Sequence, residues 1–141
     1  MHIGKNIFPQ LVNLWTGNYK DLNAGLRSYT LGSTVFQAIG KACAFSGNTI
    51  PSAFGAHVPN IATERHKFIA ETWFLFATMI APTVLYNRFQ RPLYYQHFVE
   101  LVTIFNICLL YKLTPTDIDE LEQCIVRWVE KYEKYNDFTV F

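Results

Sequence analysis

The sequence predicts an all-α fold of about five helices, because apolar residues recur at three- and four-residue steps along most of the chain. No segment shows a convincing two-residue alternation, which would indicate strands. Half of the 141 residues are apolar and 16% are aromatic, which is sufficient for a packed core. We therefore expect an orthogonal or irregular helical bundle, either as a single domain over residues 1–141 or as a fragment of a larger protein.

The first helix is expected over residues 7–15, where apolar side chains have helical spacing. Pro9 lies in this segment and is tolerable only in the first turn of a helix. Residues 16–31 contain two glycines and two asparagines, and they indicate an irregular connection.

Two further helices are expected on either side of a long loop. Residues 34–45 form the first, with Ser33 as its N-cap and Gly47 as its C-terminal glycine. Residues 64–86 form the second, which is apolar nearly all round and should be central in the fold. Pro82 should kink this helix or end it near residue 80.

The loop before the central helix belongs to the most distinctive stretch, residues 49–73. Its turn-forming residues are Pro51, Gly55, Pro59 and Asn60. It also carries apolar residues, which indicate a packed loop rather than a solvated one: Ile50, Phe54, Val58 and Ile61.

The last two helices have clear start signals. Pro92 suits the first position of a helix over residues 93–111, whose more polar side carries His97, Glu100, Thr103 and Asn106. Thr114 and Asp117 then provide an N-cap and a carboxylate three residues later. The last helix carries one apolar stripe, formed by Ile118, Leu121, Ile125, Trp128, Val129 and Tyr132.

Charge and cysteine usage narrow the function classes. The net charge is +1, so the basic excess typical of a stand-alone DNA-binding domain is missing. Cys43, Cys108 and Cys124 form no CxxC pair and are interpreted as buried small hydrophobes in a reducing compartment. The uncharged runs 72–87 and 101–111 are shorter than a membrane span, so buried helices are favoured.

Two groups of polar residues are candidates for function. If Glu71 is buried beside Trp73, it needs a partner, and we favour a structural anchor over a catalytic role. Arg65, His66 and Lys67 are its nearest candidate partners in the sequence. For DNA contact the candidates are these three residues with Arg88, Arg91, Phe89, Tyr94 and Tyr95. Core packing is the favoured alternative for the aromatic members, and a solvated rim for the basic ones.

Several motifs, in order, resemble the transposases of fungal CACTA-like (Plavaka-type) DNA transposons. They are KNIFPQLVNLWTG, IPSAFG, PNIATERHKF, AETW and YYQHFVELV. The resemblance implies a helical segment that flanks a ribonuclease-H-like nuclease core, supports DNA transposition and resides in the nucleus. It also implies a divalent metal, magnesium or manganese, in the full-length family, although this chain itself is expected to hold no cofactor.

The resemblance also singles out His2 as a catalytic residue. Family members carry an Asp-x-Met-His sequence at the rim of the core, and Met1-His2 matches its last two residues. The acidic partner would precede Met1, and the closing Glu would lie beyond Phe141. We therefore expect this chain alone to be an inactive, truncated fragment.

Two alternatives to the transposase fragment stay open. The chain is interpreted secondly as a non-catalytic helical protein-interaction module, and last as a membrane-associated hairpin. Its expected partners are the missing catalytic domain of the parent protein, DNA and a second copy of the chain, with no membrane.

Overall fold

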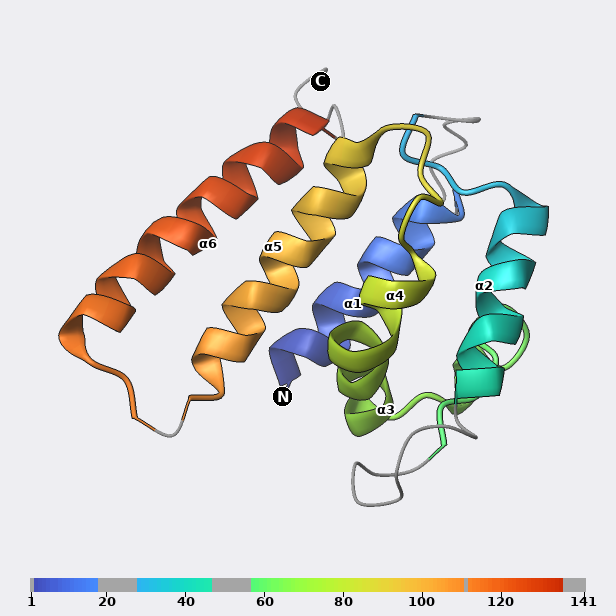
Figure 1. The fold of residues 1–141 in the computed structure, drawn as a ribbon, viewed down its shortest axis with the longest axis horizontal. Coiled ribbons are helices and arrows are strands. Elements are labelled where there is room, and N and C mark those ends of the chain that lie inside the picture. The colour runs from blue at the N-terminus through green and yellow to red at the C-terminus, as the bar shows by residue number, and fades with distance from the viewer. Residues whose placement is uncertain (1, 18–27, 47–56, 111, 136–141) are drawn as a thin grey trace. The chain divides into compact units, whose positions relative to one another are not determined.

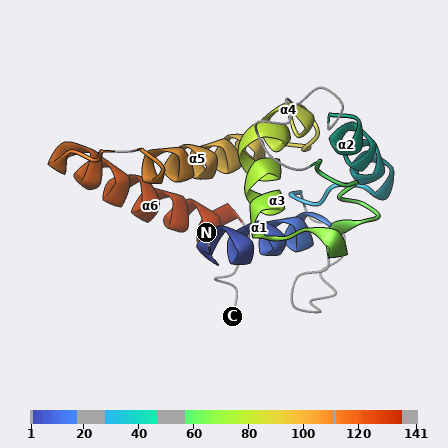
Figure 2. The ribbon, with the colours of Figure 1, turned by 90° about the horizontal axis from the view of Figure 1, so that it is seen from below.

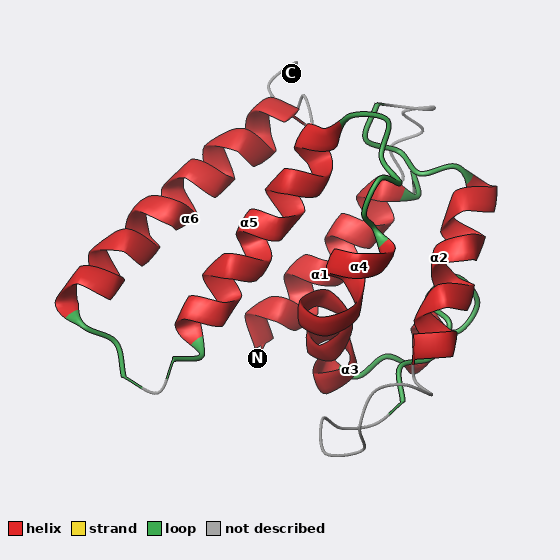
Figure 3. Cartoon of the chain, viewed as in Figure 1, coloured by secondary structure: helices red, strands yellow, loops and turns green. Residues whose placement is uncertain are grey.

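A computed structural model describes residues 2–17, 28–46, 57–110 and 112–135, and these residues contain helices and no strand, which confirms the all-α prediction (Figures 1 and 3). Each of the five predicted helical regions contains helix. The elements are α1 (His2–Trp15), α2 (Ser33–Ser46), η3 (Arg65–Lys67), α3 (Ala70–Leu75), η4 (Phe76–Ile80), α4 (Ala81–Val84), α5 (Pro92–Cys108) and α6 (Pro115–Tyr135). In the described residues, no helix is both long and apolar enough to cross a membrane.

The chain divides into two compact units, residues 1–90 and 91–141. In the N-terminal unit, α3, η4 and α4 follow one another and form what we call the central segment. Its α3 contacts α1, and its η4 and α4 contact α2 (Figure 2). In the C-terminal unit, α5 and α6 pack side by side as an antiparallel hairpin (Figure 1). The prediction of one domain over residues 1–141 stays a prediction.

Helix α1 continues through Pro9, so the expectation that this residue lies in the first turn is wrong. The helix begins at His2, and the proline cannot donate a hydrogen bond to the carbonyl of Lys5. A proline inside a helix costs about 3 kcal/mol. Burial of each large apolar side chain contributes about 2 kcal/mol, which outweighs that cost. The buried residues of α1 are Phe8, Leu11, Val12, Leu14 and Trp15.

Helix α2 begins at Ser33, one residue before the predicted start, and the Gly32 carbonyl accepts a hydrogen bond from the amide of Phe36. Ser33 is thus the first helical residue rather than the cap. Gly47, the predicted C-terminal glycine, lies outside the described residues, as do Ile50 and Phe54 of the predicted loop.

The described part of the loop, from residue 57 onward, is packed as predicted. Val58 and Ile61 are completely buried. The side-chain oxygen of Asn60 accepts a hydrogen bond from the amide of Ala62 at 2.9 Å, and its carbonyl accepts one from the amide of Glu64 at 2.7 Å. This local bonding closes a turn over the PNIATE sequence.

This turn lies directly against Gly40 in the middle of α2. A Cβ atom added to Gly40 would collide with the side-chain oxygen of Asn60 and would lie 2.8 Å from the Cβ of Ala62. The two backbones therefore approach closely because residue 40 has no side chain. Cys43, three residues further along α2, is buried, and burial raises the pKa of its thiol to about 12 although a backbone hydrogen bond from Ile61 lowers it. The prediction that Cys43 acts as a buried hydrophobe is confirmed.

The predicted helix 64–86 starts later than expected, at Ala70. Glu64 is held in the turn by Asn60, residues 65–67 form a single 3-10 turn, and Phe68 and Ile69 are extended. A continuous helix from residue 64 would require that turn to open. The proposed helix start at residues 63–64 is therefore wrong.

Pro82 does not end the helix near Ile80, so that predicted outcome is wrong, and the kink stays a prediction. Since Pro82 has no amide hydrogen, the helix cannot keep its regular bonds here. It widens into the π-helical η4, in which the amide of Ala81 donates to the carbonyl of Phe76, five residues earlier. Helix α4 then continues with Pro82 in its first turn.

Helices α5 and α6 begin as predicted. Pro92 occupies the first turn of α5. Before α6, the Thr114 hydroxyl accepts a hydrogen bond from the Asp117 amide at 3.1 Å, and the Asp117 carboxylate accepts one from the Thr114 amide at 2.8 Å. These reciprocal bonds form a capping box, and the hydrogen bonds that the Thr114 amide and hydroxyl donate to the carboxylate lower the pKa of Asp117.

Candidate functional site

The predicted catalytic residue His2 is the first residue of α1, and its side chain lies outside the described part of the structure. The match to Asp-x-Met-His is a property of the sequence alone. The catalytic role of His2 therefore stays a prediction.

Glu71 is exposed, so the condition under which it would need a partner, burial beside Trp73, is not met. It lies in the first turn of α3, where a carboxylate complements the helix dipole. The buried face of α3 is occupied instead by Trp73, two residues later and on the other side of the helix. Lys67, one of its expected partners, forms an ion pair with Glu64 at 2.8 Å.

Among the candidates for DNA contact, two aromatic residues are core residues. Phe89 packs edge-on against Trp15 with ring centroids 5.3 Å apart, and Tyr94 packs edge-on against Tyr135 at 6.2 Å. The basic candidates His66, Lys67, Arg88 and Arg91 are exposed, as a solvated rim would be. Core packing is confirmed for these two aromatic residues, and Tyr95 is half-buried.

Arg65 differs from the other basic candidates because it is half-buried. One terminal nitrogen of its guanidinium is buried and makes no hydrogen bond to any described residue, and burial lowers the pKa of the group. A single half-buried guanidinium on a three-residue turn does not define a binding site.

The strongest set of polar contacts lies between α5 and α6. The ring of His97 stacks on that of Trp128, with centroids 4.5 Å apart and planes inclined by 13°. Two reciprocal hydrogen bonds of 2.9 Å join the same residues: the indole N–H donates to the His97 carbonyl, and Nε2 of His97 contacts the Trp128 carbonyl. Because a carbonyl only accepts, Nε2 must carry the proton. His97 is thus buried, and its assignment to a polar outer side is wrong.

Further contacts extend this interface along the hairpin. Tyr132 stacks on Trp128 at 5.3 Å, and Tyr135 meets His97 edge-on at 5.4 Å. Lys131 of α6 pairs with Glu100 of α5 at 2.7 Å. Glu100 therefore forms its ion pair with a residue of the other helix.

A groove of about 260 Å³ runs between the two helices beside this ion pair. Its lining residues are Glu100, Thr103, Ile104, Cys124, Arg127 and Lys131. The guanidinium of Arg127 approaches the sulfur of Cys124 at 3.5 Å, a weak contact on the surface of α6. Cys124 is half-buried and Cys108 is exposed, so the expectation of burial is wrong for Cys108, which lies in the last turn of α5.

The predicted apolar stripe of α6 is only partly buried. Trp128 is 8% exposed, whereas four apolar side chains on the outer face are 43–51% exposed. These four residues form what we call the outer strip: Ile118, Ile125, Val126 and Val129. These exposed apolar residues make the outer strip a candidate contact surface.

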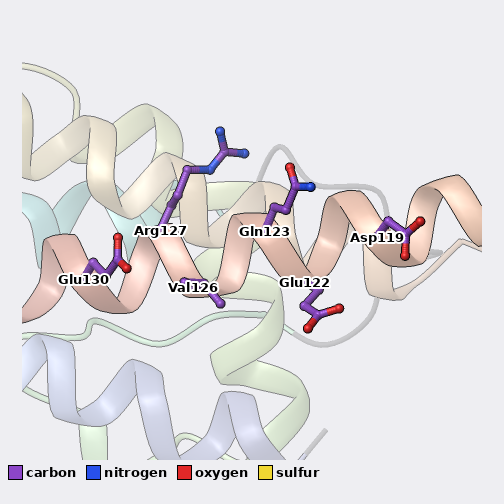
Figure 4. Close-up of a pocket in the computed structure, with 6 residues that line it drawn as sticks. All are labelled: Asp119, Glu122, Gln123, Val126, Arg127 and Glu130. Carbon is purple, nitrogen blue, oxygen red and sulfur yellow. The ribbon is translucent and has the colours of Figure 1, made fainter.

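Val126 of the outer strip lies in a shallow depression of about 640 Å³ along α6. Figure 4 shows its lining residues, which are Asp119, Glu122, Gln123, Val126, Arg127 and Glu130. Gln123 and Arg127 point to one side of the helix, and Glu122 points to the other (Figure 4). At 3.6 residues per turn, the three carboxylates of the depression lie on the same side of Ile118, Ile125 and Val129 as Val126 does.

The near-neutral net charge is the sum of a positive charge on the N-terminal unit and a negative charge on the C-terminal unit. Residues 1–90 contain seven basic and three acidic residues, which gives +4. Residues 91–141 contain five basic and eight acidic residues, which gives −3, and the two values together give the net charge of +1. The absence of a basic excess is thus a property of the whole chain and not of its N-terminal unit.

His97 makes the stability of the hairpin depend on pH. Burial lowers the pKa of His97 below its ordinary value of 6.5, although the Trp128 carbonyl and Glu100 raise it. The unfolded chain then binds a proton at higher pH than the folded chain does. We expect the contribution of His97 to stability to be complete above pH 6.5 and to be lost as the pH falls below this value.

Urea unfolding at a series of pH values between 5 and 8, in roughly half-unit steps, measures this effect. The variant His97→Asn should show a flatter dependence than the wild type. The matched control is His66→Asn, since His66 is exposed and should retain the wild-type profile. Identical dependences of stability on pH for the wild type and His97→Asn would contradict the assignment of this dependence to His97.

Compared with known proteins, the chain matches no family model, and neither a curated protein nor a solved structure matches it. The relationship to CACTA-like transposases therefore remains a proposal drawn from motifs. In the described residues, no three His, Cys, Asp or Glu side chains are grouped as a metal site requires. The divalent metal stays an expectation for the full-length family, and the role proposed below for this chain does not require it.

Proposed function

We propose that this chain is a helical binding module of a transposase-like protein, and that the outer strip of α6 is its docking surface for another protein domain. The transposase context is supported by the ordered motifs, and the docking role by the exposed apolar residues of α6. The outer strip is the observation that carries the proposal.

The hairpin holds α6 in a defined orientation, which a docking surface requires. The capping box fixes the start of α6, and the His97–Trp128 contacts fix its inner face. With the inner face committed to α5, the outer strip is left for a partner. A surface presented on a rigid element loses little conformational entropy on binding.

The test is binding of the chain to a recombinant ribonuclease-H-like domain of a CACTA-like transposase, measured by isothermal titration calorimetry. We expect Ile125→Ser combined with Val129→Ser to weaken binding at least about ten-fold, because each loses apolar area at the contact. Phe45→Ser is the matched control, since Phe45 is 70% exposed in the N-terminal unit. Absence of binding would contradict the proposal that the chain belongs to a transposase-like protein. Unchanged binding by the double variant would contradict the proposal that the outer strip is the docking surface.

DNA contact by the N-terminal unit is a second candidate function, favoured by its charge of +4. Lys41 and Arg88 are exposed basic residues of this unit. We expect Lys41→Glu with Arg88→Glu to weaken binding of duplex DNA at low salt, and to reduce the slope against log salt by about 2. Fluorescence anisotropy measures both quantities, and Lys134→Glu in α6 is the control. Affinity that does not depend on salt would refute this role.

A further inference from the structure

We propose that the occupant of the outer strip is an amphipathic helix whose apolar residues are flanked by Lys or Arg. This inference rests on the proposed docking function and names the chemistry of the partner. The charges that border the strip and the spacing of its apolar residues support it.

The spacing within the outer strip suits a helical partner. Ile118, Ile125 and Val129 are separated by seven and four residues, so they lie on one face of α6. At 1.5 Å per residue they extend over about 16 Å, or three helical turns. Two helices that pack along each other make contact through apolar residues at this spacing.

The charges that border the outer strip are acidic. Glu122 and Glu130 lie four residues before and after Val126, and Glu133 lies four residues after Val129. Asp119 completes the acidic border of the depression. These four carboxylates are exposed and, at 3.6 residues per turn, all lie on one side of Ile118, Ile125 and Val129, so they face one flank of a bound segment.

Arg127 and Lys134 are the exposed basic residues of α6: Arg127 lines the depression together with three carboxylates, and Lys134 lies four residues after Glu130. Lys131 is engaged with Glu100 on the α5 side, and Arg127 points to the side opposite Glu122 (Figure 4). Positive charge on the partner is therefore what complements the border. A partner with acidic flanks would place like charges together.

The same border disfavours a second copy of the chain as the occupant. If two α6 helices paired through their outer strips, the acidic border of one would lie against that of the other. Like charges opposed in an interface are unfavourable. A partner with Lys or Arg beside its apolar residues avoids this repulsion.

The test uses the full chain and two synthetic peptides of about 20 residues, long enough to span the strip as a helix. Both peptides carry leucine on one face, and the flanking positions are all Lys in one and all Glu in the other. We expect the Lys peptide to bind at least about ten-fold more tightly, with an affinity that falls as salt is added. The variant carrying Asp119→Lys, Glu122→Lys and Glu130→Lys should reverse this preference.

Two controls separate this inference from the proposed function. Ile125→Ser with Val129→Ser should weaken binding of the Lys peptide, while circular dichroism confirms that both sets of variants retain their helix content. Equal binding of both peptides, lost in the double variant, would overturn the partner chemistry and leave the docking surface intact. Failure of both peptides to bind, or self-association in ultracentrifugation that the double variant abolishes, would also overturn the inference.

Discussion

Replacement of Gly40 by alanine is expected to lower the free energy of unfolding of the N-terminal unit by about 3 kcal/mol. The added Cβ would collide with the side-chain oxygen of Asn60 and would lie 2.8 Å from the Cβ of Ala62. Neither group is the free end of a flexible side chain, because the Asn60 oxygen is bonded to the Ala62 amide in the turn. Relief therefore requires α2 and the turn to separate, which opens the packing around Ile61 and Cys43.

Urea unfolding followed by tryptophan fluorescence measures the change, since Trp15 and Trp73 both lie in this unit. Gly32→Ala is the matched control, because a Cβ at position 32 meets nothing within 4 Å. This control should unfold at the wild-type urea concentration or slightly below it, since Gly32 is the N-cap of α2 and alanine is a poorer N-cap than glycine. Equal midpoints for Gly40→Ala and the wild type would show that the contact is not close.

The sequence predicts elements best where the physical cause is local. The start of α6 follows from the hydroxyl of Thr114 and the carboxylate of Asp117, three residues apart, and the hydrogen bonds between them are those expected. The start of α5 at Pro92 also has a local cause, because a proline in the first turn of a helix loses no helical hydrogen bond. In both cases, the residues that decide the structure are neighbours in the chain.

The sequence alone does not reveal features that a distant segment decides. The role of Gly40 depends on the PNIATE turn about 20 residues later. From sequence alone, a glycine inside a helix indicates only a residue with weak helix propensity. His97 looks like part of a polar face until Trp128, 31 residues later, supplies a stacking surface and a carbonyl. The signal that could have indicated this pair is the position of Trp128 at the centre of the apolar stripe of α6.

The candidate site was only partly predictable for a related reason. An apolar stripe indicates which face of a helix avoids water, but not how wide the packed partner is. Helix α5 covers Trp128 and half-covers Tyr132, while Ile118, Ile125 and Val129 at the edge of the same stripe remain exposed. The stripe is thus wider than the part that α5 covers, and its uncovered residues belong to the outer strip.

Replacement of Trp128 by alanine is expected to lower the free energy of unfolding of the α5–α6 hairpin by about 4 kcal/mol. The variant loses the stack on His97, the stack on Tyr132 and the hydrogen bond from the indole to the His97 carbonyl. Trp128→Phe keeps an aromatic ring but removes the donor, so its cost should be about 1 kcal/mol from the hydrogen bond together with a smaller loss of packing. Thermal unfolding followed by circular dichroism, with hydrogen exchange of the α6 amides, measures both.

Val129→Ala is the matched control, because Val129 is adjacent to Trp128 but 43% exposed, so its replacement should change stability by no more than about 0.5 kcal/mol. The two variants should also separate stability from binding. Most of the stability of a helix in a protein comes from tertiary packing, so Trp128→Ala should weaken both the fold and binding of the Lys peptide, although its side chain faces inward. Val129→Ala should weaken binding alone. If Trp128→Ala left binding unchanged while destabilising the hairpin, the outer strip would not depend on how α5 holds α6.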